Sequence, residues 1–322
     1  MSKIQPEKFL EFARTNNPKM AEKDYLECAI LEKLFQNEYI SKNFVFAGGA
    51  SVAKSYNISN RIGQDIDLAC SDFTDVPDMR SKKKLNTFRK NFKNYVFDVL
   101  KPAISNIINQ DSRFMIVTDR DWNVLENKEP FLSSPTLHLL YRSHFGTDMG
   151  HLCVEIIPRK YPDSIISLRS VVPYSTLVPM GTVPTVAYQQ TFWDKVYALH
   201  SNANARIPHF DDGFSRHYYD VATLAPFVDL SETYPLFHDI EAYQTKYTTK
   251  EIKPVKSPSD IVLLPDDSTL YHLADDYHAI SESFNAPRET WADIVRMLQT
   301  INQNINNILF PLKSNTSATL LL

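Results

Sequence analysis

Residues 46–51 read FAGGAS and residues 61–68 read RIGQDIDL, and these two stretches decide the fold. In the first, a short apolar run stops at two adjacent glycines, and the residues after the glycines have the pattern of a helix. In the second, alternation places Asp65 and Asp67 on one face of a strand and the apolar residues on the other. The predicted order is therefore strand, glycine turn, helix and second strand.

These two stretches carry the residues that a nucleoside triphosphate needs. A helix that begins at a glycine turn offers free N–H groups and a positive dipole end to phosphate, so Gly48, Gly49 and Ser51 are candidate contacts. Two carboxylates at i and i+2 of a strand repel each other unless a cation lies between them, and oxygen ligands suit Mg²⁺ or Mn²⁺. Asp65 and Asp67 are therefore candidate metal ligands. Each feature alone is common in ordinary turns and solvated strand edges, but their conjunction favours a nucleotide site.

Patterns on either side predict a mixed α/β part. The predicted elements are helices over residues 21–38 and 80–100 and strands over residues 113–118, 136–141 and 151–157. The last of these strands carries Glu155 among apolar residues, where a lone acid is costly unless it has a partner. Glu155 is therefore the candidate third metal ligand, with an edge-strand residue facing water as the equal alternative.

Beyond residue 160 the character of the sequence changes. Residues 161–190 contain four prolines and little helical period, and we predict a crossover between two parts of the chain there. Helical patterns dominate afterwards, over residues 189–200, 215–228, 269–285 and 289–311, with an exposed proline-rich loop over residues 249–266. The prediction is an α+β protein with a mixed-sheet core and an N-terminal helix in residues 1–165. A mostly helical C-terminal domain, residues 175–322, closes the active site.

Length, composition and charge narrow the function classes. The chain has 322 residues, 43% of them apolar and 22% charged, which is enough for a sizeable core and excludes a disordered chain. The net charge of −4 gives no strong positive field for holding duplex DNA, so any nucleic-acid contact must be local. Residues 80–97 carry seven basic side chains and no acid. This segment is the candidate RNA contact, with a solvated helix face as the alternative.

Several other chemistries lack support. The three cysteines are far apart and odd in number, and with the nine histidines they form no recognisable disulfide or zinc spacing. Ser51 has no nucleophile elbow around it, so acyl transfer is not indicated. No apolar stretch is long enough for a membrane span, and the N-terminus is polar. We expect a protein of the reducing cytoplasm with no membrane contact.

The two stretches, extended to residues 46–54 and 61–68, resemble the first two motifs of the AbiEii-type nucleotidyltransferase toxins, within the DNA polymerase β-like superfamily. Residues 191–200, TFWDKVYALH, match the lysine-bearing helix of that family. Residues 215–221, SRHYYDV, match its later arginine-to-aspartate motif. The four matches lie in the family's order and span about half of the chain.

The resemblance implies Mg²⁺-dependent transfer of a nucleoside monophosphate from an NTP by a toxin that a separately encoded antitoxin restrains. Several relatives act on the 3′ end of tRNA, which makes tRNA the implied acceptor. The resemblance also implies that Asp65 and Asp67 bind the metal, that Lys195 pairs with the triphosphate and that Asp220 is an active-site carboxylate. Without the upstream motifs, Lys195 would be read as a solvated residue and Asp220 as part of a packing helix.

The resemblance is incomplete at three positions. The family commonly carries Thr, an aromatic residue and Ser where this chain has Ala50, Ile62 and Gly63. Arg61, beside them, is a candidate phosphate contact or the partner of a nearby acid. Two other functions stay open on the sequence alone: a nucleotidyltransferase that modifies a protein or a small molecule, and a non-catalytic nucleotide-binding protein that acts through a partner.

Overall fold

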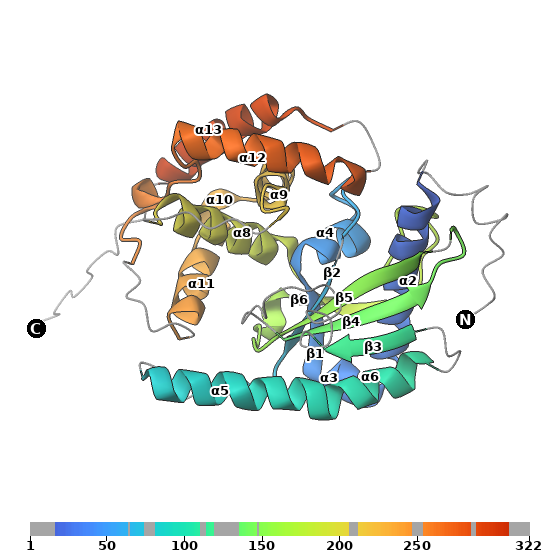
Figure 1. Cartoon of the computed structure of the whole chain (residues 1–322). Helices are drawn as coiled ribbons and strands as arrows, with labels where there is room; N and C mark the ends of the chain where they lie inside the picture. The colour runs from blue at the N-terminus through green and yellow to red at the C-terminus, as the bar shows by residue number, and fades with distance from the viewer. Residues whose placement is uncertain are drawn as a thin grey trace, which may run out of the picture.

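The computed structural model describes residues 17–63, 65–73, 81–109, 114–118, 135–146, 148–205, 212–246, 254–284 and 288–308. Its centre is a seven-stranded mixed sheet with the strand order β3-β4-β5-β2-β1-β7-β6 (Figure 1). The strands are β1 (Phe44–Ala47), β2 (Asp65–Cys70), β3 (Phe114–Thr118), β4 (Thr136–Arg142), β5 (Met149–Ile157), β6 (Ile166–Ser170) and β7 (Thr182–Val186). The α+β prediction is confirmed.

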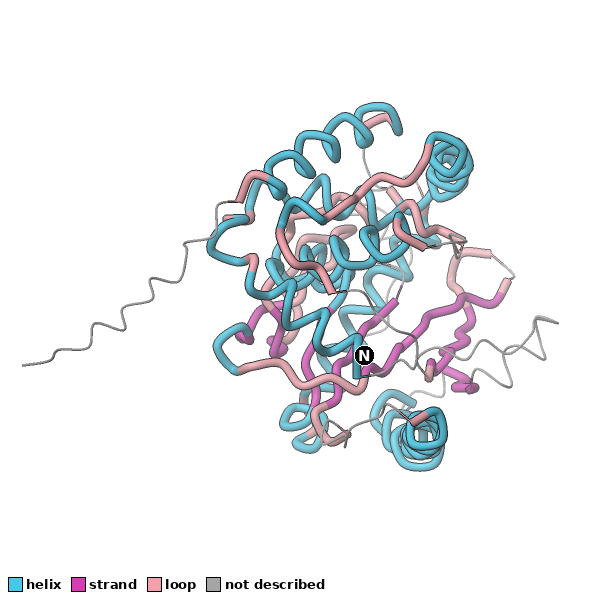
Figure 2. Tube along the Cα trace, turned by 90° about the vertical axis from the view of Figure 1, so that its left-hand side faces the viewer, coloured by secondary structure: helices cyan, strands magenta, loops and turns pink. Residues whose placement is uncertain are grey.

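Helices surround the sheet and form a separate group beside it. Those in the N-terminal half are α2 (Pro18–Phe35), α3 (Glu38–Asn43), α4 (Gly48–Tyr56), α5 (Lys82–Asn94) and α6 (Lys101–Ile108). Those in the C-terminal half are α8 (Tyr188–Ala203), α9 (Arg216–Leu224), α10 (Leu230–Thr233), α11 (Pro235–Lys246), α12 (Asp267–Ala279) and α13 (Trp291–Asn306). In Figure 2 the strands occupy the lower part of the molecule and most of the helices the upper part. None of the helices in the described ranges is long and apolar enough to cross a membrane.

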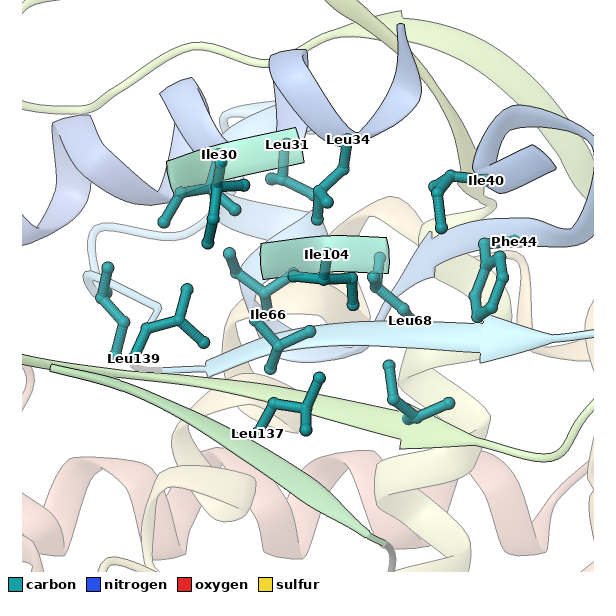
Figure 3. Packing of buried hydrophobic residues seen from close by; sticks show 14 of the residues in the cluster. Ile30, Leu31, Leu34, Ile40, Phe44, Ile66, Leu68, Ile104, Leu137 and Leu139 are labelled. Carbon is teal, nitrogen blue, oxygen red and sulfur yellow. The ribbon is translucent and has the colours of Figure 1, made fainter. Parts of the chain in front are cut away.

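The alternation in β2 separates a core face from a polar face. Ile66 and Leu68 are fully buried, and Figure 3 shows them packed beneath side chains of α2 and α6. Asp65 and Asp67 lie on the opposite face and are only partly buried. The prediction that the two aspartates share one face of a strand is therefore confirmed.

The helical group has its own core. Side chains of α8, α9, α11, α12 and α13 pack together there, and Trp193 of α8 is the largest of them to be fully buried. Val52 of α4 belongs to the same core. The helix that follows the glycine turn therefore connects the sheet to the helical group, since one of its faces packs on each.

Residues 161–190 were predicted to be an irregular connection between the two parts of the chain, and this is wrong. The segment contains β6 and β7, which complete the sheet. β6 is an edge strand with mostly exposed side chains, Leu168 among them at 73% exposure. It therefore lacks the apolar alternation by which a strand is recognised in sequence. The sheet continues to Val186 and α8 begins at Tyr188. We propose that the two parts of the chain divide at residue 187.

Two other segments differ from the sequence expectations. Residues 254–266 were expected to be exposed, but Val255, Ile261 and Leu263 are buried against the helical group. Prolines mark irregular backbone and carry no information about burial. Residues 249–253 of that segment lie outside the described part. The helix predicted over residues 80–100 continues into α6 through a π-helical turn at Tyr95–Leu100.

Candidate active site

A pocket of about 910 Å³ opens on the polar face of the sheet. Its walls come from the glycine turn, from β2 and β5, from α8 and α9, and from α5, which runs along the lower edge of the molecule in Figure 1. Seven of the residues singled out from the sequence line it: Gly48, Gly49, Arg61, Asp65, Asp67, Glu155 and Lys195. Ser51 and Asp220 are not among its lining residues. The fold thus joins motifs that are far apart in the sequence.

The glycine turn presents the start of α4 to this pocket. Gly48 has a φ of 72°, in the left-handed region that glycine adopts without strain. In the described part of the chain no side chain caps the first turn of α4, so its N–H groups are available to a ligand. The Ser51 hydroxyl donates a hydrogen bond to the Gly48 carbonyl oxygen at 2.8 Å, and the side chain is fully buried. The structure therefore turns the Ser51 hydroxyl away from the pocket.

Three carboxylates share the polar face. β2 and β5 run parallel, with Asp67 opposite Glu155, so both side chains point to the same side of the sheet. β5 lies between β4 and β2, and the edge-strand alternative for Glu155 is therefore wrong. Burial and the charges of Glu155 and Asp65 raise the pKa of Asp67 well above its ordinary value, against the opposing effect of nearby cations. The three carboxylates repel one another, and a cation bound between them would relieve that repulsion.

Basic side chains face these acids from the helical group. Arg216 Nη1 lies 3.9 Å from Asp65 Oδ2. Burial lowers the pKa of Lys195, while Asp220 and Asp67 act in the opposite direction. Lys195 is therefore not a solvated surface lysine. The pocket carries negative charge on the sheet side and positive charge on the helix side, which is the arrangement that a metal-bound polyphosphate requires.

Asp220 holds Arg61 in place. Arg61 Nε donates to Asp220 Oδ1 at 3.2 Å and Nη2 donates to Oδ2 at 3.0 Å, and both side chains are buried. A Cβ added to Gly49 would lie 2.6 Å from Arg61 Nη2 and 3.2 Å from Asp220 Oδ2. The ion pair is thus packed against the glycine turn. Asp220 acts on the pocket through Arg61 and Lys195 without lining it.

Two of the departures from the family pattern, Ala50 and Gly63, touch each other. A Cβ added to Gly63 would lie 2.5 Å from Ala50 Cβ and 2.8 Å from Ala50 Cα. The residue pair Ala50 and Gly63 therefore allows the backbone before β2 to approach α4 closely. A larger side chain at either position would push α4 and the backbone before β2 apart. The small residues at positions 50 and 63 therefore depend on each other.

Lys54 closes the first motif but lies outside the pocket. Its Nζ is 2.6 Å from Asp24 Oδ1 and 2.7 Å from Glu27 Oε2, and all three side chains are at most 1% exposed. Burial raises the pKa of Glu27, while Lys54 opposes this effect. Lys54 therefore ties α4 to α2 and supports the glycine turn from behind.

His217 and Arg159 are among the residues of the pocket wall that sequence reasoning missed. Burial, with the charges of Lys195 and Arg216 as lesser causes, lowers the pKa of His217 well below its ordinary value, so the ring is neutral at pH 7. His217 follows Arg216 directly within the fourth motif, and this adjacency was the signal available. Arg159 follows β5 with no motif to mark it.

Arg159 is fixed on three sides. Its guanidinium lies 4.5 Å from the ring centre of Tyr161 and 4.6 Å from that of Tyr243, and its Nη1 is 2.8 Å from Asp194 Oδ1. Asp194 directly precedes Lys195 on α8. The pair joins the end of β5 to the lysine-bearing helix, so this contact helps to place Lys195 opposite the carboxylates.

α5 forms the remaining wall. Arg89, Lys90 and Lys93 line the pocket together with Asn86, Phe88 and Phe92. Leu85 and Phe92 are the buried residues of this helix, and its remaining surface is basic. The predicted basic segment is thus a wall of the pocket, although Arg80 lies outside the described residues.

The chain is similar in sequence to one protein family and in structure to several solved proteins. The sequence profile of a family described as nucleotidyl transferase AbiEii toxin, type IV TA system, matches residues 29–298. The crystal structure of JHP933 from Helicobacter pylori is similar, with a TM-score of 0.47 and 14% identity over 90% of this chain and 93% of that one. An antigenic nucleotidyltransferase-like protein from Paracoccidioides brasiliensis has a TM-score of 0.36 and 12% identity over 76% of this chain and 96% of that one. No curated protein sequence matches.

Proposed function

The chain belongs to the AbiEii nucleotidyltransferase toxin family of toxin–antitoxin systems, and on that premise we propose that it transfers a nucleoside monophosphate from an NTP to the 3′ end of tRNA. The observation that carries the proposal is the composition of the pocket. An uncapped helix start, three carboxylates, a half-buried lysine and a basic helix all line it. The first three features suit a metal-bound triphosphate, and the fourth suits an RNA acceptor.

The triphosphate would bind between the glycine turn and the helical group. Phosphate oxygens accept hydrogen bonds from the N–H groups at the start of α4, where the helix dipole also favours negative charge. Lys195 and Arg216 approach from the other side and balance the phosphate charge. Arg61, held by Asp220, lies beside the turn, so that its position changes little when the nucleotide enters.

Asp65, Asp67 and Glu155 would hold Mg²⁺ or Mn²⁺. Their donors are all carboxylate oxygens, the ligands that Mg²⁺ prefers, and their mutual repulsion favours a cation. When bound, the ion would neutralise phosphate charge during transfer.

The transfer itself is a substitution at the α-phosphorus. The oxygen of an acceptor hydroxyl forms a bond to that phosphorus, the bond from phosphorus to the bridging oxygen breaks, and pyrophosphate leaves. The hydroxyl proton passes to a carboxylate. We assign this role to Glu155, because it lies on β5, one strand farther than Asp67 from the glycine turn where the phosphates would bind.

The basic helix favours RNA over a small acceptor. Arg89, Lys90 and Lys93 line the same pocket as the carboxylates, and Lys82, Lys83 and Lys84 extend the positive charge along α5. A small acceptor needs no such surface, whereas an RNA strand entering by its 3′ end would follow it. The family also implies an antitoxin partner, which we expect to be a separately encoded protein.

The test is transfer by the purified protein with Mg²⁺ and each labelled NTP in turn, in the presence of total tRNA. We expect label at the 3′ end of tRNA, and no label with an Asp65→Asn variant. Label in a protein or in a small molecule would assign the acceptor to the other class of nucleotidyltransferase. Absence of label from every acceptor, with NTP bound, would contradict the proposed reaction.

A further inference from the structure

A second cluster of ligand-type side chains lies on the polar face of the sheet. His138 of β4 stands opposite Cys153 of β5, and His151 precedes Cys153 by two residues, so all three side chains share one face. Their ligand atoms lie within 4.8 Å of one another, and in the described residues this is the one group of three that does so. His138 is buried, and the other two are half-buried.

We propose that His138, His151 and Cys153 bind a zinc ion. The site is distinct from the candidate Mg²⁺ site in both its residues and its chemistry. Two imidazole nitrogens and one sulfur select zinc or a similarly soft divalent cation, whereas Mg²⁺ prefers oxygen. The inference does not depend on the proposed transfer reaction, because it rests on the donor atoms of these three residues alone.

The separations between the donor atoms fit tetrahedral zinc. His138 Nδ1 is 2.9 Å from His151 Nε2, and Cys153 Sγ lies 3.7 Å and 3.5 Å from these two atoms. With Zn–N near 2.05 Å and Zn–S near 2.3 Å, tetrahedral angles give about 3.3 Å between two nitrogens and about 3.6 Å between sulfur and nitrogen. Both sulfur separations agree closely. The nitrogen pair needs to open by only a few tenths of an ångström.

Three protein ligands would leave a fourth position for water or another oxygen. Asp65 is near it in the sheet, since β2 places Asp65 opposite Cys153. On zinc binding the S–H bond breaks, an S–Zn bond forms and the proton goes to solvent. Asp65 then gains a neighbouring cation. Binding of zinc would therefore change the charge next to Asp65, a candidate catalytic carboxylate.

The sequence did not reveal this cluster. The cysteines and histidines form no zinc spacing along the chain, so the sequence predicts no zinc ligand set. The available signal was the pair His151 and Cys153 at i and i+2 of a predicted strand. The third member comes from a different strand, and its register could not be read from the sequence.

Cobalt binding to the metal-free full-length chain tests the proposal directly. We expect one tetrahedral Co²⁺ per chain, recognised by strong visible bands and a thiolate-to-cobalt charge-transfer band that Zn²⁺ removes; Co²⁺ held by the carboxylates alone lacks the thiolate band. Cys153→Ala should abolish the charge-transfer band, and His138→Ala should weaken Zn²⁺ binding by at least about 100-fold, because loss of a ligand exceeds loss of an outer contact. Cys70→Ala and the exposed His272→Ala serve as matched controls that should bind as wild type.

A second measurement needs no variant. Cys28 and Cys70 are fully buried and Cys153 is half-buried, so a maleimide should react first at Cys153. Zn²⁺ should slow that reaction at least about tenfold, as followed by mass spectrometry of the peptides. Unchanged labelling at Cys153, a cobalt spectrum without the thiolate band, or wild-type zinc affinity in Cys153→Ala would each overturn the proposal and leave a hydrogen-bonded imidazole pair.

Discussion

The Asp67 carboxylate lies directly against the Cα of Gly48. A Cβ added to Gly48 would stand 1.7 Å from Asp67 Oδ2 and 2.6 Å from its Cγ, so no residue with a side chain fits. The contact sets the distance between the carboxylate cluster and the start of α4. A metal-bound triphosphate has to reach both, and the glycine fixes how far apart they are.

Gly48→Ala should therefore reduce the rate of transfer strongly while lowering the free energy of unfolding only modestly. The added methyl group must displace Asp67, and a misplacement of about 1 Å at a reacting centre can cost about 100-fold in rate. Gly213→Ala is the matched control, because Gly213 also has a positive φ, 80°, but its Cβ would meet nothing closer than 3.5 Å. Both variants should lose about 1–2 kcal/mol in thermal or urea unfolding, and only Gly48→Ala should lose transfer. Equal activity in the two variants would contradict the spacing argument.

Replacing Asp67 should separate activity from stability. Asp67→Asn removes one of three mutually repelling carboxylates, so we expect the melting temperature to stay the same or to rise. Transfer should fall by at least about 100-fold, because the phosphates lose a stabilising cation. Single-turnover transfer across a Mg²⁺ series, alongside thermal melting, measures both effects. An Asp67→Asn protein with wild-type turnover would remove this residue from the proposed ligand set.

Lys195→Ala should weaken NTP binding or turnover by at least about tenfold without lowering stability. Burial disfavours the charged amine, so its removal does not cost the fold a favourable contact with water. The exposed Lys256→Ala is the control for a loss of positive charge outside the pocket. Equilibrium NTP binding and thermal melting of the variant test this prediction. Normal NTP binding, or a large drop in melting temperature, would show that Lys195 contributes to packing and not to NTP binding.

The sequence predicted the carboxylate strand well because a period of two is a local property. The apolar run before the two glycines is β1 and the alternating segment is β2, and Asp67 and Glu155 were identified without knowledge that they would be neighbours. The edge strand β6 was missed because an exposed strand needs no apolar side. The interior strand β7 was missed as well, because Pro184 interrupts its apolar pattern. Local pattern therefore predicted most of the strands that bury one face, and it failed where the strand is exposed or contains a proline.

The sequence could not predict which side chains from distant positions contact one another in the fold. Arg61 and Asp220 are 159 positions apart, and nothing local distinguishes a phosphate-binding arginine from one held by a carboxylate. His138 and Cys153 likewise become neighbours only through the register of β4 and β5. In each case the chemistry depends on which side chains meet, and that is decided by strand order and helix packing.

Lys54, Asp24 and Glu27 form a buried ion cluster behind the glycine turn. Replacing the lysine and replacing Glu27 should change the free energy of unfolding by different amounts. Lys54→Met leaves two carboxylates buried without a cation and should cost about 3–5 kcal/mol of unfolding free energy. Glu27→Gln keeps the shape and the pair of Lys54 with Asp24, and should cost little at pH 7. Urea unfolding of both variants tests the contrast, and equal losses would contradict it.

The pH dependence of Glu27→Gln has a defined sign. The pKa of Glu27 in the folded chain is raised above 4.5 by burial, so its contribution to stability is fully present below pH 4.5 and is lost as the pH rises through the folded pKa. The stability of wild type relative to Glu27→Gln should therefore fall with rising pH over that range. A difference that stays flat or rises with pH would show that the folded pKa is not raised.

The basic start of α5 gives the sharpest test of the acceptor class. Lys82, Lys83 and Lys84 occupy the first turn, where positive charge opposes the helix dipole, so they do not stabilise the helix. The triple variant Lys82→Glu, Lys83→Glu, Lys84→Glu should therefore fold normally. If these residues contact RNA phosphates, each lost contact lowers the log–log salt slope of binding by about 0.7, and KM for tRNA rises while NTP affinity is unchanged. Lys256→Glu, a reversal on the exposed surface of the helical part, is the control. Transfer to tRNA across a salt series decides between an RNA acceptor and a small-molecule acceptor. If KM for tRNA and the salt slope of tRNA binding equal those of wild type, this end of α5 is a solvated face. The acceptor surface would then have to be sought on the C-terminal helices.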